Sequence, residues 1–167
     1  MNRRQSVAIS FLGYNLDAAP AGADRWERWR PNVGLCGAED LIIDRLELLT
    51  DARHQKLADQ VAADIVQISP ETEVRQNVLK IRDPWDFQEV YEALHDFCAD
   101  YEFDPEHEDY FAHMTTGSHV AQICLFLLSE ASYLPGKLIQ TAPPRSRRRT
   151  ERNAARSWLG TRQVIDL

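Results

Sequence analysis

The segment 120–131 constrains the fold of this chain most, because it has the length of a helix and is apolar on nearly every side. A helix without a polar face is largely buried in a protein core. The segment 109–114 that precedes it is short and strand-like, and the polar turn 115–119 joins the two. A strand that leads through a short turn into a buried helix indicates a layered α/β domain.

Strands and helices alternate along the rest of the chain. Short apolar or alternating segments predict strands over 7–12, 41–49, 73–81, 137–140 and 163–167. A helical apolar period predicts two more helices, one from residue 52 to Ser69-Pro70 and one that begins at Asp86. Polar loops are expected over 14–37 and 100–109. This alternation predicts a mainly parallel sheet with helices on both faces.

The predicted helix that begins at Asp86 carries one continuous apolar stripe. Asp86 can cap its first turn, and Glu89 completes the capping pair three residues later. The stripe has the i, i+3, i+4, i+7 spacing of one helix face and consists of Phe87, Val90, Tyr91, Leu94, Phe97 and Cys98. Such a stripe either packs on the core or serves an interface between two copies of the chain.

Length and composition favour one globular domain over residues 1–167, with 44% hydrophobic and 27% charged residues. The three cysteines are far apart and form no CxxC pair, so neither a disulfide framework nor a zinc ribbon is expected. The apolar run 7–12 is too short for a signal peptide, and no run approaches the ~20 residues that span a bilayer. We therefore expect a cytoplasmic protein without a membrane partner.

The charge is divided unevenly along the chain. Residues 145–167 carry seven arginines and two acidic residues, whereas the other 144 residues carry 12 basic and 24 acidic ones. The net charge of −7 argues against a surface that coats nucleic acid in general. The Arg-rich segment 145–162 is expected to be mobile, and it is either a solvated linker or a grip on nucleic acid.

The turn 115–119 carries the clearest chemistry. Ligands of an open parallel sheet sit beyond the carboxyl ends of its strands, and a helix N-terminus presents unpaired N–H groups and partial positive charge. The turn therefore predicts an anion site, and its candidate residues are Thr115, Thr116, Gly117, Ser118, His119 and Gln122. The alternative is that Thr116 or Ser118 only caps the helix and that His119 is structural.

The first predicted strand ends at Gly13, so the turn Gly13-Tyr14-Asn15 is expected at the same edge of the sheet. Neither the dinucleotide fingerprint nor a P-loop is present, which disfavours NAD and ATP, and no cofactor is expected. The five histidines lack the spacing of a metal site. No G-x-S-x-G motif is present, and no catalytic residue is assigned.

The predicted loop 14–37 combines aromatic and basic side chains. Trp26 and Arg30 suit stacking on bases and contact with phosphate. The alternative is that Trp26 and Trp29 anchor the long loop to the body of the domain, because tryptophans are mostly buried. Arg53 is a second candidate countercharge for an anion.

Several motifs spread over nearly the whole chain match one known family. They include Phe11-Leu12-Gly13, Trp29-Arg30-Pro31, the segment 43–49, Asp83-Pro84-Trp85-Asp86-Phe87, Thr115-Thr116-Gly117 and His119-Val120-Ala121-Gln122. The chain resembles the N-terminal domain of the RtcR family, activators of a bacterial RNA-repair operon that encodes an RNA ligase and an RNA 3′-phosphate cyclase. Tyr14 and Ser118 depart from the family pattern, because each stands where threonine is expected.

That resemblance implies a CARF-type, Rossmann-like domain that senses a ligand and pairs as a homodimer, rather than an enzyme. In the family such a domain restrains an AAA+ ATPase, which works with sigma-54 RNA polymerase and precedes a helix-turn-helix domain. Neither of these two domains is expected in this chain. The implied signal is damaged RNA whose ends carry a 2′,3′-cyclic phosphate, such as a cleaved transfer RNA.

Two other functions stay open. A CARF-type nuclease that acts on its bound RNA or cyclic oligonucleotide would use His119 as a base and Thr116 to orient a 2′-hydroxyl. No second acid–base group is evident near the turn, which argues against that function. A dimerisation module without a ligand would use the apolar stripe of the helix that begins at Asp86.

Overall fold

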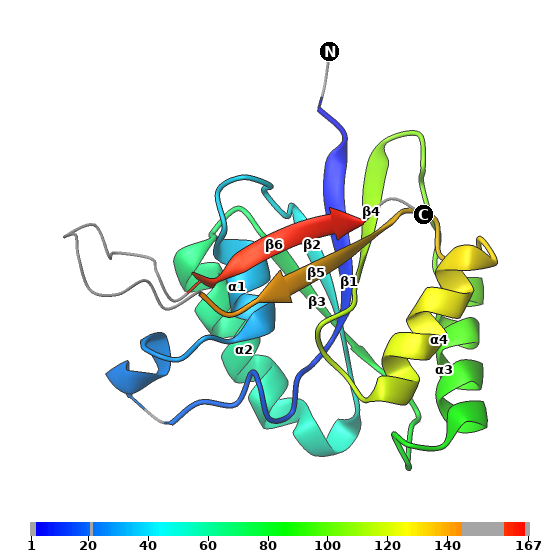
Figure 1. Cartoon of the computed structure of the whole chain (residues 1–167), viewed down its shortest axis with the longest axis horizontal. Helices are drawn as coiled ribbons and strands as arrows, with labels where there is room; N and C mark the ends of the chain where they lie inside the picture. Colours follow the sequence, from blue (N-terminus) through cyan, green and yellow to red (C-terminus); the bar gives the residue numbers. More distant parts are fainter. Residues whose placement is uncertain (1–2, 21, 145–158, 166–167) are drawn as a thin grey trace.

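The structure is a computed structural model, and it describes residues 3–20, 22–144 and 159–165. These residues form one six-stranded sheet in the order β3-β2-β1-β4-β5-β6 (Figure 1). The strands are β1 (Gln5–Phe11), β2 (Arg45–Thr50), β3 (Glu73–Val78), β4 (Glu108–His113), β5 (Lys137–Ala142) and β6 (Thr161–Ile165). Strands β1 to β5 are parallel, and β6 pairs antiparallel with β5. The predicted mainly parallel α/β sheet is confirmed.

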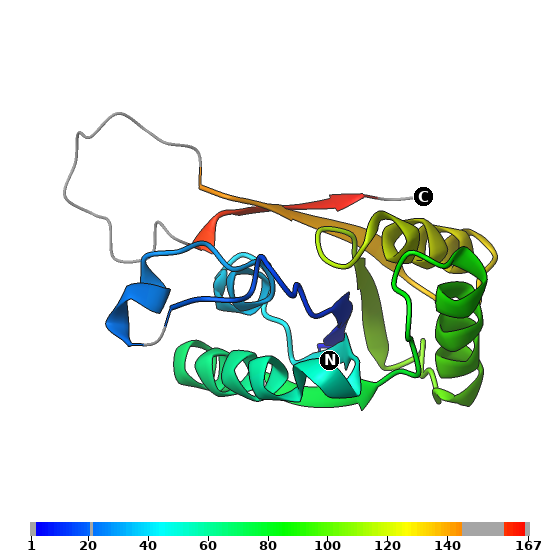
Figure 2. The same ribbon diagram turned by 90° about the horizontal axis from the view of Figure 1, so that it is seen from below.

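Helices cover both faces of the sheet (Figure 2). One face carries α1 (Pro31–Gly37) and α2 (Gln55–Ile68), and the other carries α3 (Phe87–Asp100) and α4 (His119–Glu130). Two 3-10 turns, η1 (Ala23–Trp26) and η2 (Ala52–His54), lie on the connections. Because side chains alternate along a strand, Val7 and Ile9 of β1 enter the core under α3 and α4, and Ala8 enters the core under α1 and α2.

The apolar stripe of α3 belongs to the core. Val90, Leu94 and Cys98 are buried in the cluster shared by the sheet and α4. Asp86 caps the helix as predicted and accepts the N–H of Glu89 at 2.9 Å. The prediction that this stripe serves an interface between copies is wrong for these buried members, because strands and α4 already cover them. Phe87, at the start of α3, remains 47% exposed.

Helix α4 is less completely buried than its sequence indicates. One side of it faces the core through Ala121, Cys124, Leu125 and Leu128. The opposite side is apolar but open to solvent, with exposed fractions of 51%, 38% and 39% for Ile123, Phe126 and Leu127. The helix therefore presents an apolar outer face that the described residues do not cover.

The predicted loop 14–37 contains a helix that its polar, Pro- and Gly-containing sequence did not indicate. Helix α1 begins with Pro31 at its first position, and all seven of its residues are buried. Gly34 permits the close approach of the segment before β6, because a Cβ there would lie 2.5 Å from the carbonyl oxygen of Leu159. Arg162 of β6 holds the other end of the helix by donating to the carbonyl oxygens of Leu35, Ala38 and Leu41.

The Arg-rich segment 145–162 lies mostly outside the described residues, so its mobility and its contact with nucleic acid stay predictions. The predicted last strand begins two residues earlier than expected, at Thr161. The predicted second strand begins at Arg45, four residues later than expected. Nowhere in the described ranges is a helix long and apolar enough to cross a bilayer.

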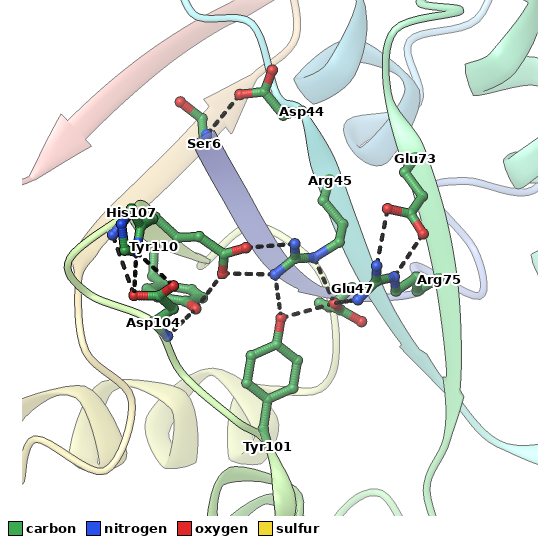
Figure 3. A network of polar contacts seen from close by, with 11 residues as sticks. Ser6, Asp44, Arg45, Glu47, Glu73, Arg75, Tyr101, Asp104, His107 and Tyr110 are labelled. Atoms are coloured by element: carbon green, nitrogen blue, oxygen red, sulfur yellow. Dashed lines mark hydrogen bonds and ion pairs between the residues drawn. The ribbon is translucent and has the colours of Figure 1, made fainter. Parts of the chain in front are cut away.

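A polar network closes the sheet at the amino ends of β2 and β4 (Figure 3). Arg45 donates to both carboxylate oxygens of Glu108 at 2.6 and 2.8 Å, and to Glu47 at 3.0 Å. The hydroxyl of Tyr101 accepts from Arg45 at 2.7 Å and donates to Glu47 at 2.9 Å. Glu47 is 1% exposed, and its second oxygen accepts from Asn77 at 2.8 Å. The buried charges at this end pair with one another.

Candidate functional site

A cavity of about 380 Å³ opens at the carboxyl ends of β1 and β4. Its lining includes the turn after β1 and the start of α4, and these two segments lie below the sheet's centre in Figure 1. None of the described residues that line it is acidic, although the chain as a whole is. Three segments form the wall: residues 11–16, the approach to α3 with Ile81, Pro84, Trp85 and Val90, and the start of α4 with Gly117, Ser118, His119 and Ala121.

The N-terminus of α4 brings unpaired backbone N–H groups to this cavity. Ser118 is the N-cap residue, and its Oγ accepts the N–H of Ala121 at 3.1 Å and donates to the carbonyl oxygen of Pro84 at 2.6 Å. The N–H groups of residues 115–120 have no acceptor among the described residues. Together with the helix dipole, they make this end of α4 attractive to an anion.

The turn after β1 supplies a second set of such groups. Asp17 closes the turn, because its carboxylate accepts the N–H of Gly13 at 2.8 Å and its own N–H donates back to the carbonyl oxygen of Gly13 at 2.8 Å. Within the described ranges, no acceptor is present for the N–H groups of Tyr14, Asn15 and Leu16, which all line the cavity. The cavity therefore has unpaired amides on two sides.

Gly117 holds these two sides close together. Its φ of +93° lies in the left-handed region that favours glycine. A Cβ at this position would lie 3.1 Å from the Cβ of Ala121 and 3.2 Å from the Cβ of Phe11. Any other residue would strain the turn and push the start of α4 away from the end of β1.

A buried network of side chains lies beneath the cavity. His113 at the end of β4 is fully buried, and its ring nitrogens lie 2.8 Å from Ser10 Oγ and 2.9 Å from Thr141 Oγ1. Ser10 Oγ also lies 3.2 Å from Thr116 Oγ1 and 2.5 Å from Asn32 Oδ1. The network thus connects β1, β4, β5, α1 and the turn before α4.

The hydrogen bonds of this network fix where its protons lie. The amide nitrogen of Asn32 donates to the carbonyl oxygen of Phe11 and to Asp17, so its oxygen accepts the single proton of Ser10. Ser10 Oγ then accepts from Nδ1 of His113, and Nε2 of that ring lies 2.9 Å from the hydroxyl of Thr141, which donates to Thr115 Oγ1 at 3.2 Å. Burial lowers the pKa of His113 to about 3, which keeps the ring neutral in this arrangement.

A charged cluster stands beside the cavity at the end of β2. The Tyr14 ring stacks on the His54 ring with centroids 3.6 Å apart, and the Tyr14 hydroxyl donates to Asp51 at 3.0 Å. Burial and the neighbouring Asp51 carboxylate raise the pKa of Tyr14 above its usual range. Arg53 donates to Asp51 at 2.7 Å, and its side chain is 57% exposed. Tyr14 is therefore protonated and committed to Asp51 at neutral pH.

The structure brings six of the twelve predicted site residues together around the cavity. They are Gly13, Tyr14 and Asn15 on one side and Gly117, Ser118 and His119 on the other. His119 is exposed, and its ring has no hydrogen bond to any described residue. The hydroxyl of Ser118 is engaged in the cap, as the alternative interpretation expected. Contact of these residues with a ligand stays a prediction.

The other six predicted residues do not line the cavity. Arg30 is 1% exposed and pairs with Asp64 at 2.7 Å, so its charge is engaged inside the domain. Thr116 is 1% exposed and belongs to the buried network. Trp26, Thr115 and Gln122 are half-buried. Trp26 packs on the core, and the guanidinium of Arg25 lies 5.0 Å from its ring. Arg53 donates to Asp51.

Sequence reasoning missed the contribution of Trp85. This residue lines the cavity from the approach to α3, with 65% of its side chain exposed. In the sequence it stands next to a helix cap and was assigned no role in a site. No local signal marked it, because an apolar residue directly before an N-cap often packs against its own helix instead. Among the described residues, no group of three His, Cys, Asp or Glu side chains could hold a metal ion.

Solved structures place the sheet in a recognisable class. The chain superposes on Enterococcus italicus Csm6 bound to cyclic hexa-2′-fluoro-hexa-dAMP with a TM-score of 0.65, over 99% of this chain and 43% of Csm6, at 14% identity. It superposes on Can2 from Sulfobacillus thermosulfidooxidans in complex with cyclic tetra-adenylate with a TM-score of 0.50, over 83% of this chain and 32% of Can2, at 14% identity. The fold is thus the CARF-like, Rossmann-type fold.

Sequence comparison then identifies the family. The family described as RtcR, regulator of RNA terminal phosphate cyclase, matches residues 4–167. The transcriptional regulatory protein RtcR of Escherichia coli (strain K12) is 56% identical over 144 residues, which are 86% of this chain and 27% of that relative. The chain belongs to the RtcR family, as its motifs predicted, and it spans about a quarter of the length of this curated relative.

Proposed function

We propose that this chain is the ligand-sensing domain of a cytoplasmic transcriptional regulator of RNA repair. Its ligand is an RNA end with a 2′,3′-cyclic phosphate, such as a transfer RNA fragment. In a full-length protein, the domain controls an attached AAA+ ATPase that acts with sigma-54 RNA polymerase. Membership of the RtcR family supports this proposal, because the E. coli relative is a transcriptional regulatory protein.

The single observation that carries the proposal is the double row of unpaired backbone N–H groups around one cavity. One row belongs to residues 14–16 and the other to the N-terminus of the twelve-residue helix α4. Backbone N–H groups at a helix N-terminus bind phosphate without any basic side chain. The absence of acidic residues from the described lining removes the repulsion that an anion would meet elsewhere on this acidic chain.

A titration of synthetic RNAs tests this function. Four RNAs of one sequence, ending in a 2′,3′-cyclic phosphate, a 3′-phosphate, a 2′-phosphate or a free hydroxyl, are titrated against the chain by calorimetry. We expect the cyclic phosphate end to bind most tightly and the hydroxyl end least. His119→Ala should weaken the cyclic phosphate complex about tenfold to a hundredfold, because a charge-assisted hydrogen bond contributes about 1.5–3 kcal/mol. His107→Ala removes an exposed histidine at the opposite end of the sheet and serves as the control. Equal affinity for all four ends would overturn the proposal.

The lining of the cavity supports binding rather than cleavage. Tyr14 and His119 are the titratable residues in the described lining, and Tyr14 is held protonated beside Asp51. His119 alone cannot act as both the base and the acid of an RNA cleavage step. Incubation of end-labelled RNA with the chain should therefore give no product, and a product that disappears in His119→Ala would favour the nuclease instead.

The outer face of α4 supports homodimerisation. Ile123, Phe126 and Leu127 are apolar and exposed on this face. An exposed apolar face of a helix is a common site of association between copies. Sedimentation of the chain should show a dimer that Phe126→Glu converts into a monomer. A monomer at all concentrations would remove dimerisation from the proposal and leave RNA binding in place.

A further inference from the structure

The indole of Trp85 is held in the open at the mouth of the cavity. It is 65% exposed, the highest value among the large hydrophobic side chains of the described residues. A tryptophan buries about 150–250 Å² when it packs against protein, so leaving it in water forfeits a large favourable term. An exposed aromatic residue that lines a cavity is therefore informative in a way that an exposed leucine is not.

The backbone beneath Trp85 is fixed by hydrogen bonds. The N–H of Trp85 donates to Asp83 at 2.9 Å, and the N–H of Asp86 donates to the carbonyl oxygen of Asp83 at 3.2 Å. The carbonyl oxygen of Pro84 accepts from Ser118, which joins this loop to the start of α4. The indole is thus carried by a rigid loop that is tied to the amide row, and the His119 ring lies 6.3 Å from it.

Besides Trp85, the cavity lining contains several apolar side chains. Leu16, 41% exposed, and Leu12 belong to the β1 side of the cavity. Ile81 and Val90 also line it. The lining therefore combines apolar side chains, which suit a flat, uncharged ring, with backbone N–H groups, which suit an anion.

We propose that Trp85 and the apolar side chains of the cavity lining form a nucleobase subsite, in which the base of the terminal nucleotide of RNA stacks on the indole. The phosphate of the same nucleotide then lies at the amide rows of residues 14–16 and of α4. This inference rests on the proposed function and adds the part of the ligand that the amides do not recognise. Stacking of bases on aromatic side chains is worth about 1–3 kcal/mol per base and tolerates any base, because every base has a flat π face.

Few groups in the subsite can read the edge of a base. Asn15 is exposed, and its side-chain amide has no hydrogen bond to the described residues. His119 is the other lining residue with a free polar side chain, since the hydroxyls of Tyr14 and Ser118 are engaged. Two such groups give a preference rather than strict selection, so all four terminal bases should bind within about tenfold of one another.

Binding of a short RNA with a 2′,3′-cyclic phosphate end tests the subsite. Trp85→Ala should weaken this RNA about tenfold or more, and Trp85→Phe should retain most of the affinity because it keeps a stacking ring. Phe87→Ala is the matched control, because Phe87 is also an exposed aromatic residue of this region but does not line the cavity. Its affinity should equal that of the unaltered chain.

A second RNA separates the base from the phosphate. It has the same sequence and cyclic phosphate end, but its terminal nucleotide lacks the base. The unaltered chain should bind it about tenfold or more weakly than the complete RNA, and Trp85→Ala should bind the two RNAs equally. Thermal unfolding of each variant shows whether the chain is still folded.

The outcomes distinguish the subsite from the function on which it rests. If the complete RNA binds the unaltered chain but Trp85→Ala binds it equally well, the subsite is overturned and the sensor function stands. The same holds if Trp85→Ala changes the dimer equilibrium but not the RNA affinity, because the indole is then an interface residue. If neither RNA binds the unaltered chain, the proposed function itself fails.

Discussion

The two ends of the sheet treat their polar groups in opposite ways. At the amino ends of the strands, Arg45 satisfies two buried or nearly buried carboxylates, and Tyr101 completes the network (Figure 3). At the carboxyl ends, two rows of backbone N–H groups lack acceptors among the described residues, and the indole of Trp85 stands exposed. The polar side chains at the amino ends stabilise the fold by pairing with one another, whereas the N–H groups at the carboxyl ends have no partner within the described residues.

The difference is the reason that we propose an anion site at one end of this acidic chain only. At the amino end, the Arg45 guanidinium holds the pKa of Glu108 below its usual range. A carboxylate that is already paired with Arg45 leaves no positive charge for a phosphate. At the carboxyl end, partial positive charge comes from backbone dipoles, which no side chain of the described lining neutralises.

The largest effect is expected at the amino ends of the strands, where a substitution breaks the Arg45 network. Arg45→Ala removes the 3.0 Å ion pair of Glu47, which is 1% exposed, and leaves this carboxylate only a 3.8 Å contact with Arg75. Loss of one partner of a buried ion pair typically costs about 3–5 kcal/mol. The free energy of unfolding in urea should fall by about that amount. RNA affinity of the variant, measured where it is still folded, should be unchanged; a loss of affinity would show that the two ends are coupled.

The second effect concerns the pH dependence of stability and the buried ring of His113 beneath the cavity. The pKa of His113 is about 3 in the folded chain, against about 6.5 when unfolded. Between these values the unfolded chain binds the extra proton, so this contribution to stability is complete above pH 6.5 and is lost as the pH falls. Unfolding free energies between pH 7 and pH 5 should decline by about 1 kcal/mol per pH unit below 6.5. His113→Asn should show a shallower decline, and an identical slope in both proteins would contradict a neutral buried ring.

A smaller effect is expected from removing a helix cap, and it should differ between the N-cap of α4 at the cavity and the N-cap of α3. Ser118→Ala removes the N-cap of α4 and frees the loop that carries Trp85, whereas Asp86→Ala removes only the N-cap of α3. Each should lower the free energy of unfolding by about 1 kcal/mol. Only Ser118→Ala should also weaken RNA binding in the same titration. Equal RNA affinities of the two variants would show that the tie to Pro84 does not position Trp85.

The smallest effect is expected for an exposed ion pair beside the Arg45 network. Arg75 pairs with Glu73 at 2.7 Å, and both side chains are about half exposed, at 51% and 56%. Exposed ion pairs contribute about 0–1 kcal/mol. Arg75→Ala should therefore change the urea midpoint little, even though Arg75 lies beside Glu47 in Figure 3. A loss as large as that of Arg45→Ala would mean that Arg75 is part of the buried network.

The sheet and its helices could be predicted from the sequence because apolar patterns and helix caps depend on residues that are close together in the chain. The short apolar run of β1 and the helical stripe of α3 each indicate their own element, and the cap at Asp86 fixes where α3 begins. The seven-residue helix α1 was missed because its burial comes from β6 and α2, which are far away in the chain. No local pattern reports a contact of that kind.

The site was predicted in outline for a related reason. The edge of the sheet follows from the order of strands and turns, so Gly13 and Gly117 were expected near each other. Whether a side chain points into the cavity depends on packing that the sequence does not state. Arg30 turns inward to Asp64, and Thr116 turns inward to Ser10, whereas Trp85 turns outward.

Arg162 of β6 and Asn32 hold opposite ends of α1 by hydrogen bonds. Asn32, in the first turn of α1, is bonded to the carbonyl oxygen of Phe11 and to Asp17, directly beneath the cavity. Helix α1 therefore connects the last strand with the turn after β1 through side-chain hydrogen bonds, in addition to the direct pairing of β6 with β5.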